Sequence, residues 1–275
     1  MKMIAAGIVL YNPDINLLSE NIDAIISQVD LLILVDNASS NISLVKDLYN
    51  KSPKILIIQN ETNKGIAYAL NQILHACEKN NYAWVLTLDQ DSTCANNLIE
   101  TYAKYLNIDN IGILCPRIVD RNYLVEESYS KPEVEYIKTC ITSGSFMNVK
   151  ICREIGYYDE NMFIDLVDFE YCVRVQKAGF KIARLNSAIL FHRLGELKVV
   201  NFFGKKIRVT NHSANRVYYY ARNSIYYLNK HKDYLSRYRV YSNLLKKITK
   251  VLIFEKEKNS KLKSFILGIK HSNYM

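Results

Sequence analysis

The sequence predicts an α/β protein in which a mostly parallel sheet flanked by helices occupies residues 1–200 and a basic, aromatic, helical extension occupies residues 201–275. In the first part, short apolar runs of strand length alternate with segments of helical period. The composition, with 49% hydrophobic and 23% charged residues, is that of a folded globular chain. The net charge of +9 is uneven: the extension holds 17 Lys and Arg against 3 Asp and Glu, which gives it +14 and leaves −5 for residues 1–200.

The expected strands are the short apolar runs of the chain. In order they are Met3–Leu10, Leu31–Val35, Lys54–Ile58, Ala83–Leu88, Ile111–Cys115, Ile141–Val149, Lys181–Leu185 and Ala188–Phe191. Helices are predicted where apolar residues recur every three or four positions, as they do at Leu70, Ile73, Leu74 and Cys77. These helices span 17–26, Gly65–Lys79, Asn96–Leu106 and Val167–Lys177, and the polar stretch 117–138 is expected to be irregular.

Several classes of protein are disfavoured by what the sequence lacks. The longest apolar run, Ile4–Tyr11, is far shorter than the roughly 20 residues that cross a bilayer. The six cysteines form no C-x-x-C pair, so we expect reduced, buried thiols of a cytoplasmic protein instead of a zinc or redox site. Tyr11-Asn12-Pro13 follows the first strand, where a dinucleotide-binding oxidoreductase needs a glycine-rich turn, and no P-loop is present.

Three polar clusters follow directly after predicted strands. They are Asp36-Asn37-Ala38-Ser39, Asn60–Gly65 and Asp89-Gln90-Asp91. In a parallel sheet the ligand binds at the carboxyl ends of the strands, so the position of these clusters alone makes them candidate ligand-binding residues. Two carboxylates spaced i, i+2 can offer oxygen ligands to a divalent cation, which neutralises a diphosphate. The alternative for Asp89 and Asp91 is a turn that caps the next helix.

Taken together, these clusters resemble glycosyltransferase family 2, the inverting nucleotide-sugar enzymes of Rossmann-like GT-A fold, over about residues 3–200. The resemblance rests on Asp36, on Asn63-Lys64-Gly65-Ile66-Ala67 with Asn71, and on Asp89-Gln90-Asp91. It implies that Asp36 binds the nucleobase and that Asn63 and Gly65 line the nucleotide pocket. It further implies that Asp91 holds Mg²⁺ or Mn²⁺, with Asp89 near the ribose and the metal.

A fourth motif, Phe163–Arg174 followed by Gly179, resembles the acidic acceptor motif of that family in the form found in bacterial rhamnosyltransferases. Val167-Asp168 stands where most members have Glu-Asp, which leaves Asp168 as the predicted catalytic base. Such a base takes the proton of the acceptor hydroxyl while that oxygen attacks the anomeric carbon. The alternative is structural, with Asp165 as a helix N-cap and Asp168 favouring the helix dipole.

Three further segments match the resemblance. Ser143-Gly144-Ser145 is similar to the small-residue turn beneath the donor sugar, although an ordinary turn would look the same. His192 stands where family members place a histidine near the diphosphate or metal, but a lone histidine is often structural. The run from Arg216 to Ser224 resembles the aromatic segment of rhamnosyltransferases, which implies that Arg222 grips the diphosphate or shapes the acceptor site; the alternative is a helix core with snorkelling arginines.

The basic extension suits an anionic membrane surface, which would bring the protein to the inner face of the cell membrane and to a lipid-linked glycan acceptor. The expected reaction is transfer of L-rhamnose from dTDP-rhamnose during cell-surface polysaccharide synthesis. The alternatives are a UDP-hexose donor or, in another class, a nonenzymatic nucleic-acid-binding protein. No nucleic-acid partner is expected, because residues 1–200 carry −5 and gather carboxylates at strand ends.

Overall fold

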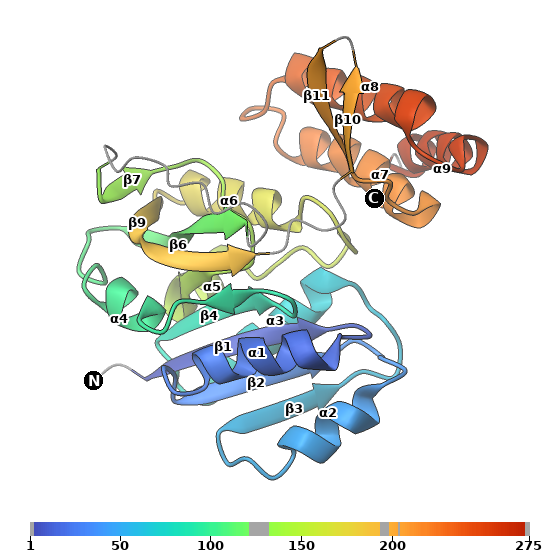
Figure 1. Cartoon of the computed structure of the whole chain (residues 1–275). Helices are drawn as coiled ribbons and strands as arrows, with labels where there is room; N and C mark the ends of the chain where they lie inside the picture. The colour runs from blue at the N-terminus through green and yellow to red at the C-terminus, as the bar shows by residue number, and fades with distance from the viewer. Residues whose placement is uncertain (1–2, 121–131, 193–197, 203, 273–275) are drawn as a thin grey trace. The chain divides into compact units, whose positions relative to one another are not determined.

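The structure is a computed structural model that describes residues 3–120, 132–192, 198–202 and 204–272 of the 275-residue chain (Figure 1). The chain forms two compact units. The first comprises Met1–Glu160 and Tyr171–Arg193, and the second comprises Asn161–Glu170 and Leu194–Met275. Each unit contains a cluster of buried hydrophobic residues.

The first unit is built on a nine-stranded sheet in the order β3-β2-β1-β4-β8-β6-β9-β5, with β7 paired to β9. The strands are β1 Ile4–Leu10, β2 Leu31–Asp36, β3 Ile55–Gln59, β4 Trp84–Asp89, β5 Thr93–Cys94, β6 Ile111–Asp120, β7 Val134–Tyr136, β8 Ser145–Asn148 and β9 Lys181–His192. Strands β1 to β4 pair in parallel, as predicted. Strand β8 runs antiparallel to both of its neighbours and makes the sheet mixed.

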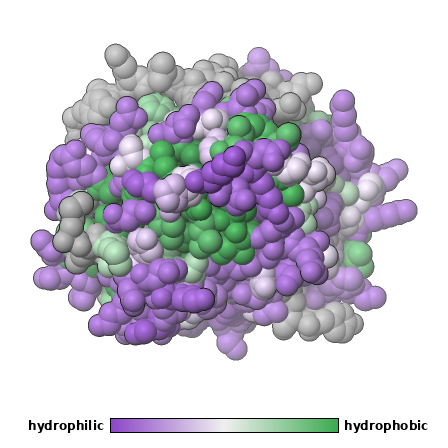
Figure 2. All heavy atoms as spheres, turned by 90° about the horizontal axis from the view of Figure 1, so that it is seen from below, coloured by the Kyte–Doolittle hydropathy of each residue, from purple (hydrophilic) through white to green (hydrophobic). Residues whose placement is uncertain are grey.

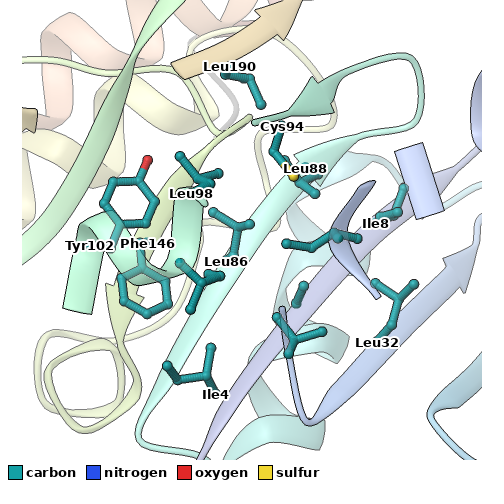
Figure 3. Packing of buried hydrophobic residues seen from close by; sticks show 14 of the residues in the cluster. Ile4, Ile8, Leu32, Leu86, Leu88, Cys94, Leu98, Tyr102, Phe146 and Leu190 are labelled. Carbon is teal, nitrogen blue, oxygen red and sulfur yellow. The ribbon is translucent and has the colours of Figure 1, made fainter. Parts of the chain in front are cut away.

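Helices pack on both faces of this sheet. Helices α1 (Ile15–Ile25), α2 (Ile42–Tyr49) and α4 (Leu98–Ala103) share one core with the strands. In that core the ring of Tyr102 stacks on that of Phe146, and their centroids lie 5.1 Å apart. Figure 3 shows both side chains among the neighbouring hydrophobic residues. Helices α3 (Ile66–Lys79) and α5 (Val149–Ile155) pack against each other, and α3 lies so close to β1 that a Cβ on Gly7 would be 2.4 Å from Ile73.

The register of the parallel strands aligns the polar clusters of the sequence. Leu10 at the end of β1 pairs with Asp36, and its neighbour Val9 pairs with Asp89 on the other side. Asp36 in turn pairs with Gln59, the last residue of β3. The carboxyl ends of four adjacent strands therefore meet at one edge of the sheet, where the sequence predicts the ligand.

One flank of the first unit keeps apolar side chains in contact with solvent. Figure 2 looks at the molecule from the side on which α2 and β3 lie in Figure 1, and hydrophobic residues gather on that face inside a hydrophilic rim. On these two elements the exposed large hydrophobic residues are Leu44, Leu48 and Leu56. Strand β3 is the first strand in the order of the sheet, so its outer side is an edge.

The second unit combines a hairpin with three helices. Strand β10 (Lys198–Phe202) pairs antiparallel with β11 (Lys205–Val209), and helices α7 (Ala214–Lys230), α8 (Arg237–Phe254) and α9 (Lys258–His271) follow. The core of these helices contains Val217, Ala221, Ile225, Leu244, Val251 and Phe265. Helices α7 and α9 approach closely at Gly268, where a Cβ would lie 2.4 Å from the carbonyl oxygen of Tyr218. No helix among the described residues is long and apolar enough to cross a membrane.

The structure differs from the sequence predictions at several elements. The strand expected at Ile141–Val149 is limited to β8, because Asn148 caps a helix by accepting hydrogen bonds from the amides of Lys150 and Ile151. The two strands expected after Lys181 are one, β9, which runs through the polar pair Asn186-Ser187. Helix α2 and the β10–β11 hairpin were not predicted, and β6 and β7 enter the stretch expected to be irregular, of which 121–131 lie outside the described residues.

Candidate active site

Asp89, Asp91 and His192 form a cluster that could hold a metal ion. One ligand atom from each residue lies within 4.8 Å of the others, and all three side chains are partly buried. Asp89 ends β4 and His192 ends β9, and the pairing of Thr93 with Phe191 brings the D-x-D loop beside the end of β9. Carboxylate oxygens with one imidazole suit Mn²⁺ or Mg²⁺, so the residues present fit the predicted cation.

The buried hydroxyl groups of Ser92 and Ser143 form hydrogen bonds to residues of this cluster. The hydroxyl of Ser92 lies 2.8 Å from Nδ1 of His192 and 2.8 Å from the hydroxyl of Ser143. The hydroxyl of Ser143 accepts a hydrogen bond from the backbone amide of Asp89 at 3.0 Å. With Nδ1 engaged by Ser92, Nε2 of His192 is the nitrogen left for a cation, as in other histidine ligands whose second nitrogen is held. Sequence reasoning missed Ser92, although it directly follows the D-x-D motif.

The D-x-D loop is also fixed through its middle residue. The amide of Tyr11 donates to Oε1 of Gln90 at 2.8 Å, and Nε2 of Gln90 donates to the carbonyl of Tyr11 at 3.3 Å. The buried Asn21 of α1 donates from Nδ2 to the carbonyl of Asp89 at 2.8 Å. These contacts tie the loop to the end of β1 and to α1, so the backbone that carries both carboxylates has a defined position.

Asp36 lies at the end of β2, and its side chain is fully buried. Its carboxylate oxygens accept the amide of Ser39 at 3.1 and 3.3 Å, across a turn in which Ala38 has a φ of 68°. An aspartate that accepts from the backbone of its own turn stabilises that turn. The structure therefore assigns Asp36 a local role, and its binding of a nucleobase stays a prediction.

Asn37 links the first two polar clusters, a function that the sequence did not reveal because amide side chains are common in turns. Its Nδ2 donates to Oδ1 of Asn63 at 2.9 Å and to the carbonyl of Gly65 at 3.1 Å. Its Oδ1 accepts from the amide of Lys64 at 3.0 Å and from Nδ2 of Asn60 at 3.3 Å. The Asn63–Gly65 loop is thus clamped beside Asp36, and Gly65 has a φ of 88°, which favours glycine at the start of α3.

The turn at Ser143-Gly144 requires a small residue for reasons of backbone geometry. Gly144 has a φ of 82°, and a Cβ there would lie 2.5 Å from Cγ of Pro116. The amide of Gly144 donates to the carbonyl of Thr87 at 2.7 Å, and the hydroxyl of Tyr102 donates to the carbonyl of Gly144 at 2.7 Å. The proximity of this turn to a donor sugar stays a prediction.

The second unit holds the first part of the acidic motif, as far as Glu170. Asp165 and Leu166 both have left-handed backbone conformations, with φ values of 67° and 65°. Consecutive non-glycine residues in this region store strain, which surrounding contacts must offset. Arg216 supplies one such contact, since its Nε and Nη2 donate to Oδ1 of Asp165 at 3.2 and 3.1 Å. Asn223, fully buried, supplies another by donating to the carbonyls of Ile164 and Asp165 at 2.7 and 3.1 Å.

Arg222, the predicted diphosphate ligand, contacts the same segment. Its Nη2 donates to the carbonyl of Asn161 at 2.6 Å and its Nε donates to Oδ1 of Asn223 at 3.0 Å. The guanidinium also lies 4.9 Å from the ring centre of Tyr219, and that ring stacks on Phe163. The aromatic run of α7 therefore packs against the segment before α6 (Val167–Lys177), and contact of Arg222 with a diphosphate stays a prediction.

Asp168 lies in the first turn of α6 (Val167–Lys177) and is partly buried. Its Oδ1 accepts from the amide of Phe169 at 2.9 Å. Two residues on, the fully buried Glu170 pairs with Lys230 at 2.9 Å and lies 3.1 Å from Nε2 of His231. These contacts hold the start of α6 to the end of α7, so the backbone that carries Asp168 has buried support.

Comparison with solved structures identifies the class of fold. The chain is similar to GalNAc-T7 with UDP, GalNAc and Mn²⁺ (TM-score 0.64, 14% identity, all of this chain and 57% of that one). It is also similar to the mannosyltransferase PcManGT from Pyrobaculum calidifontis in complex with GDP-Man and Mn²⁺ (TM-score 0.62, 11% identity, 99% of this chain and 75% of that one). A third is S. aureus TarS 1-349 in complex with UDP-GlcNAc (TM-score 0.60, 14% identity, 97% and 81%). The predicted GT-A fold is confirmed.

Sequence comparison identifies the family. The profile of glycosyl transferase family 2 matches residues 6–165, more than half of the chain, and the chain therefore belongs to glycosyltransferase family 2. Over 287 aligned residues it is 29% identical to the dTDP-rhamnosyl transferase RfbF of Shigella flexneri, covering 96% of this chain and 93% of that protein. The predicted family is confirmed, and the protein is a glycosyltransferase.

Proposed function

We propose that this glycosyltransferase transfers L-rhamnose from dTDP-rhamnose to a lipid-linked glycan at the inner face of the cell membrane, with inversion at the anomeric carbon. The cluster of Asp89, Asp91 and His192 at the carboxyl edge of the sheet carries the proposal for a nucleotide-sugar donor. The full-length similarity to a dTDP-rhamnosyl transferase supports rhamnose as the sugar.

The donor site in this proposal is the carboxyl edge of β1 to β4. Asp91 and His192 would hold Mn²⁺ or Mg²⁺, with Asp89 beside them, and the cation would neutralise the charge of the diphosphate. Asp36, Asn63 and Gly65 would lie toward the nucleoside. Ser143 and Gly144 would lie toward the sugar. Arg222 would bind the diphosphate or shape the acceptor site.

The acceptor chemistry is assigned to Asp168. Its carboxylate would accept the proton of the acceptor hydroxyl as that oxygen bonds to the anomeric carbon and the dTDP leaves from the opposite face. The buried pairing of Glu170 with Lys230 and the bonds of Asn223 to the preceding loop hold the backbone on both sides of Asp168. A positioned base needs such support, because small displacements reduce its contribution strongly.

The membrane-facing surface in this proposal is on α8. Tyr238, Tyr241, Leu245 and Leu252 are exposed and recur at spacings of three, four and seven, which places them on one stripe of the helix. The buried Leu244 and Val251 lie on another side, toward the helical core. An exposed apolar stripe on a strongly basic unit suits the surface of an anionic bilayer.

The donor is tested with a panel of nucleotide sugars, a lipid-linked acceptor and Mn²⁺, reading the dTDP or UDP released and the sugar attached. We expect turnover with dTDP-rhamnose and its loss in Asp91→Ala. Turnover with a UDP-hexose instead would select the alternative donor. Absence of transfer from every nucleotide sugar, in a protein that binds none of them, would contradict the donor site itself.

The membrane surface needs a separate test, because removing α8 and α9 would also remove half of the buried core of the second unit. The sharper variant is Leu245→Gln with Leu252→Gln. Its matched control is Leu44→Gln with Leu48→Gln on α2, where both leucines are also exposed. We expect the first pair to reduce sedimentation with phosphatidylglycerol vesicles and the second to leave it unchanged. Equal binding by both would refute the α8 surface.

A further inference from the structure

The second unit contains a cavity of about 390 Å³ that the proposed reaction does not use. It lies between the segment before α6, the segment after β11 and the helices α7 and α8. Its lining residues are Asp165, Thr210, His212, Arg216, Tyr220, Asn243, Lys246, Lys247, Lys250 and Glu255. All of them belong to the second unit.

The two lysines of α8 that face this cavity from one helical turn apart are Lys246 and Lys250. Both are exposed, and among the described residues neither pairs with a carboxylate. Like charges at positions i and i+4 of a helix repel each other and destabilise it slightly. An anion between them would remove that repulsion.

The carboxylates of the cavity are already engaged by other cations. Asp165 pairs with Arg216 at 3.1 Å. Glu255 shares its charge between Lys247 at 3.4 Å and the almost fully buried Lys261 at 2.9 Å. The cavity is therefore lined by four cationic side chains and two acidic ones. One of the two acidic residues, Glu255, also pairs with Lys261, which does not line the cavity.

The titration of the buried groups agrees with a surplus of positive charge. Burial, together with the charges of Arg216 and Lys247, lowers the pKa of His212 to about 4, against the opposing charges of Asp165 and Glu255. Burial also lowers the pKa of Lys247, against the opposing effect of Glu255. His212 is consequently neutral at pH 7 and can donate one hydrogen bond into the cavity.

Neutral donors complete the lining. Thr210, Tyr220 and Asn243 bring a hydroxyl, a phenol and an amide to the same space. Burial raises the pKa of Tyr220, so its phenol keeps its proton. Ammonium and guanidinium groups interleaved with hydroxyl and amide donors are the set that binds phosphate oxygens.

We propose that this cavity is a binding site for a phosphate or diphosphate group, held chiefly by Lys246 and Lys250. On the same helix, Leu245 of the exposed apolar stripe lies next to Lys246, about 100° around the axis. A ligand that joins a phosphate to a lipid chain fits both features. Its source is the diphosphate of the lipid-linked acceptor, which rests on the proposed function, or the phosphate headgroup of a membrane phospholipid.

The site is tested first with inorganic diphosphate by calorimetry, in EDTA and without nucleotide sugar. EDTA keeps the metal cluster of the first unit from contributing, and the result does not depend on transfer activity. We expect Lys246→Gln with Lys250→Gln to reduce affinity by about tenfold or more, because two charge-assisted hydrogen bonds are lost. The matched control removes two charges from α9 outside the cavity, Lys263→Gln with Lys270→Gln, and should bind as the unaltered protein does. Equal loss in both pairs, or no binding of diphosphate by the unaltered protein, would overturn the site.

The source of the phosphate is tested with phosphatidylcholine vesicles that contain either a polyprenyl diphosphate or phosphatidylglycerol at the same charge. If the variant Lys246→Gln with Lys250→Gln loses binding only to the vesicles with polyprenyl diphosphate, the site binds the acceptor diphosphate. If this variant loses binding to both kinds of vesicle, the site binds a phospholipid headgroup. If this variant binds both kinds of vesicle as well as the control variant Lys263→Gln with Lys270→Gln does, the cavity binds no membrane phosphate, and this part of the proposal fails.

Discussion

The hydroxyl of Ser92 lies 2.8 Å from Nδ1 of His192, and Ser143 connects that hydroxyl to the backbone amide of Asp89. The side chain of His192 and the backbone of Asp89 are therefore connected through buried hydroxyl groups. Such outer contacts orient a metal ligand and fix which nitrogen of an imidazole is available. These contacts fix the positions of groups that could hold a cation.

Replacing Ser92 with alanine should weaken the Mn²⁺-dependent binding of dTDP by about 10- to 100-fold, the usual effect of removing an outer-shell partner of a metal ligand. The binding is measured by calorimetry at fixed nucleotide with increasing Mn²⁺. Ser43→Ala, on the exposed side of α2, is the matched control and should change nothing. If Ser92→Ala binds as tightly as this control, His192 is not oriented for a cation by the hydroxyl.

Asp36→Ala should weaken dTDP binding and leave Mn²⁺ binding intact, since Asp36 is proposed to face the nucleobase and belongs to a different cluster from Asp91. The substitution also removes the bonds to the Ser39 amide and should cost about 1 kcal/mol of stability. Asp14→Ala is the control, because Asp14 likewise accepts backbone amides, at the start of α1. It should lose similar stability without loss of nucleotide affinity. Equal affinities in both variants would leave Asp36 as a turn residue alone.

Gly144→Ala should destabilise the first unit much more than Gly179→Ala. Both glycines have a positive φ, so an alanine at either costs roughly 1 kcal/mol or more in backbone strain. At Gly144 the new Cβ also meets Pro116 at 2.5 Å, whereas at Gly179 nothing lies within 4 Å. The overpacking should add about 1–3 kcal/mol. Urea unfolding of the two variants measures the difference, and similar midpoints would contradict the tight packing at Pro116.

Glu170→Gln should cost about 3 kcal/mol of stability, because it leaves Lys230 and His231 without their buried carboxylate. Glu100→Gln is the control: its partner Lys104 lies 3.3 Å away, but both side chains are mostly exposed. A surface pair of this kind contributes only about 0.5 kcal/mol. Thermal unfolding of both variants measures the two losses of stability. Equal losses would contradict a buried ion pair at Glu170 that stabilises the fold more than a surface pair does.

The sequence was sufficient to predict the parallel half of the sheet and the edge that carries the site. The parallel arrangement of alternating strands and helices predicts that Asp36 and Asp89 lie at the same edge of the sheet. The register confirms this alignment, since Asp36 ends β2 and Asp89 ends β4, on either side of β1. What the sequence could not provide is the partner of each side chain. Asn37 and Ser92 are ordinary turn residues by type, and their contacts join segments separated by 26 and 100 positions.

The second unit was harder to predict for a different physical reason. The strands of the β10–β11 hairpin, KVVNF and KKIRV, mix apolar residues with lysine and arginine and form no apolar run of strand length, so the hairpin was missed. The run from Arg216 to Ser224 was recognised in the sequence, but only the structure shows that Asn223 donates to the carbonyls of Ile164 and Asp165. That contact explains how two strained residues persist directly before the helix that carries Asp168.

Asp168→Asn should reduce transfer by about 10²- to 10⁴-fold, the usual contribution of a positioned general base. Folding and dTDP affinity should survive, because asparagine keeps the size of the side chain and its hydrogen bond to the Phe169 amide. Initial rates of dTDP release with saturating donor and acceptor measure the loss, and calorimetry with dTDP measures donor binding independently.

Asp165→Asn separates the catalytic role from the structural one. Asparagine tolerates the left-handed backbone found at this position, so the main loss is the ion pair with the half-exposed Arg216, worth at most about 1 kcal/mol. Turnover should remain largely intact. If Asp165→Asn abolishes transfer and Asp168→Asn turns over normally, the base is Asp165. If both variants are active, the acidic motif supports the fold of the second unit, and the acceptor proton is taken by another group.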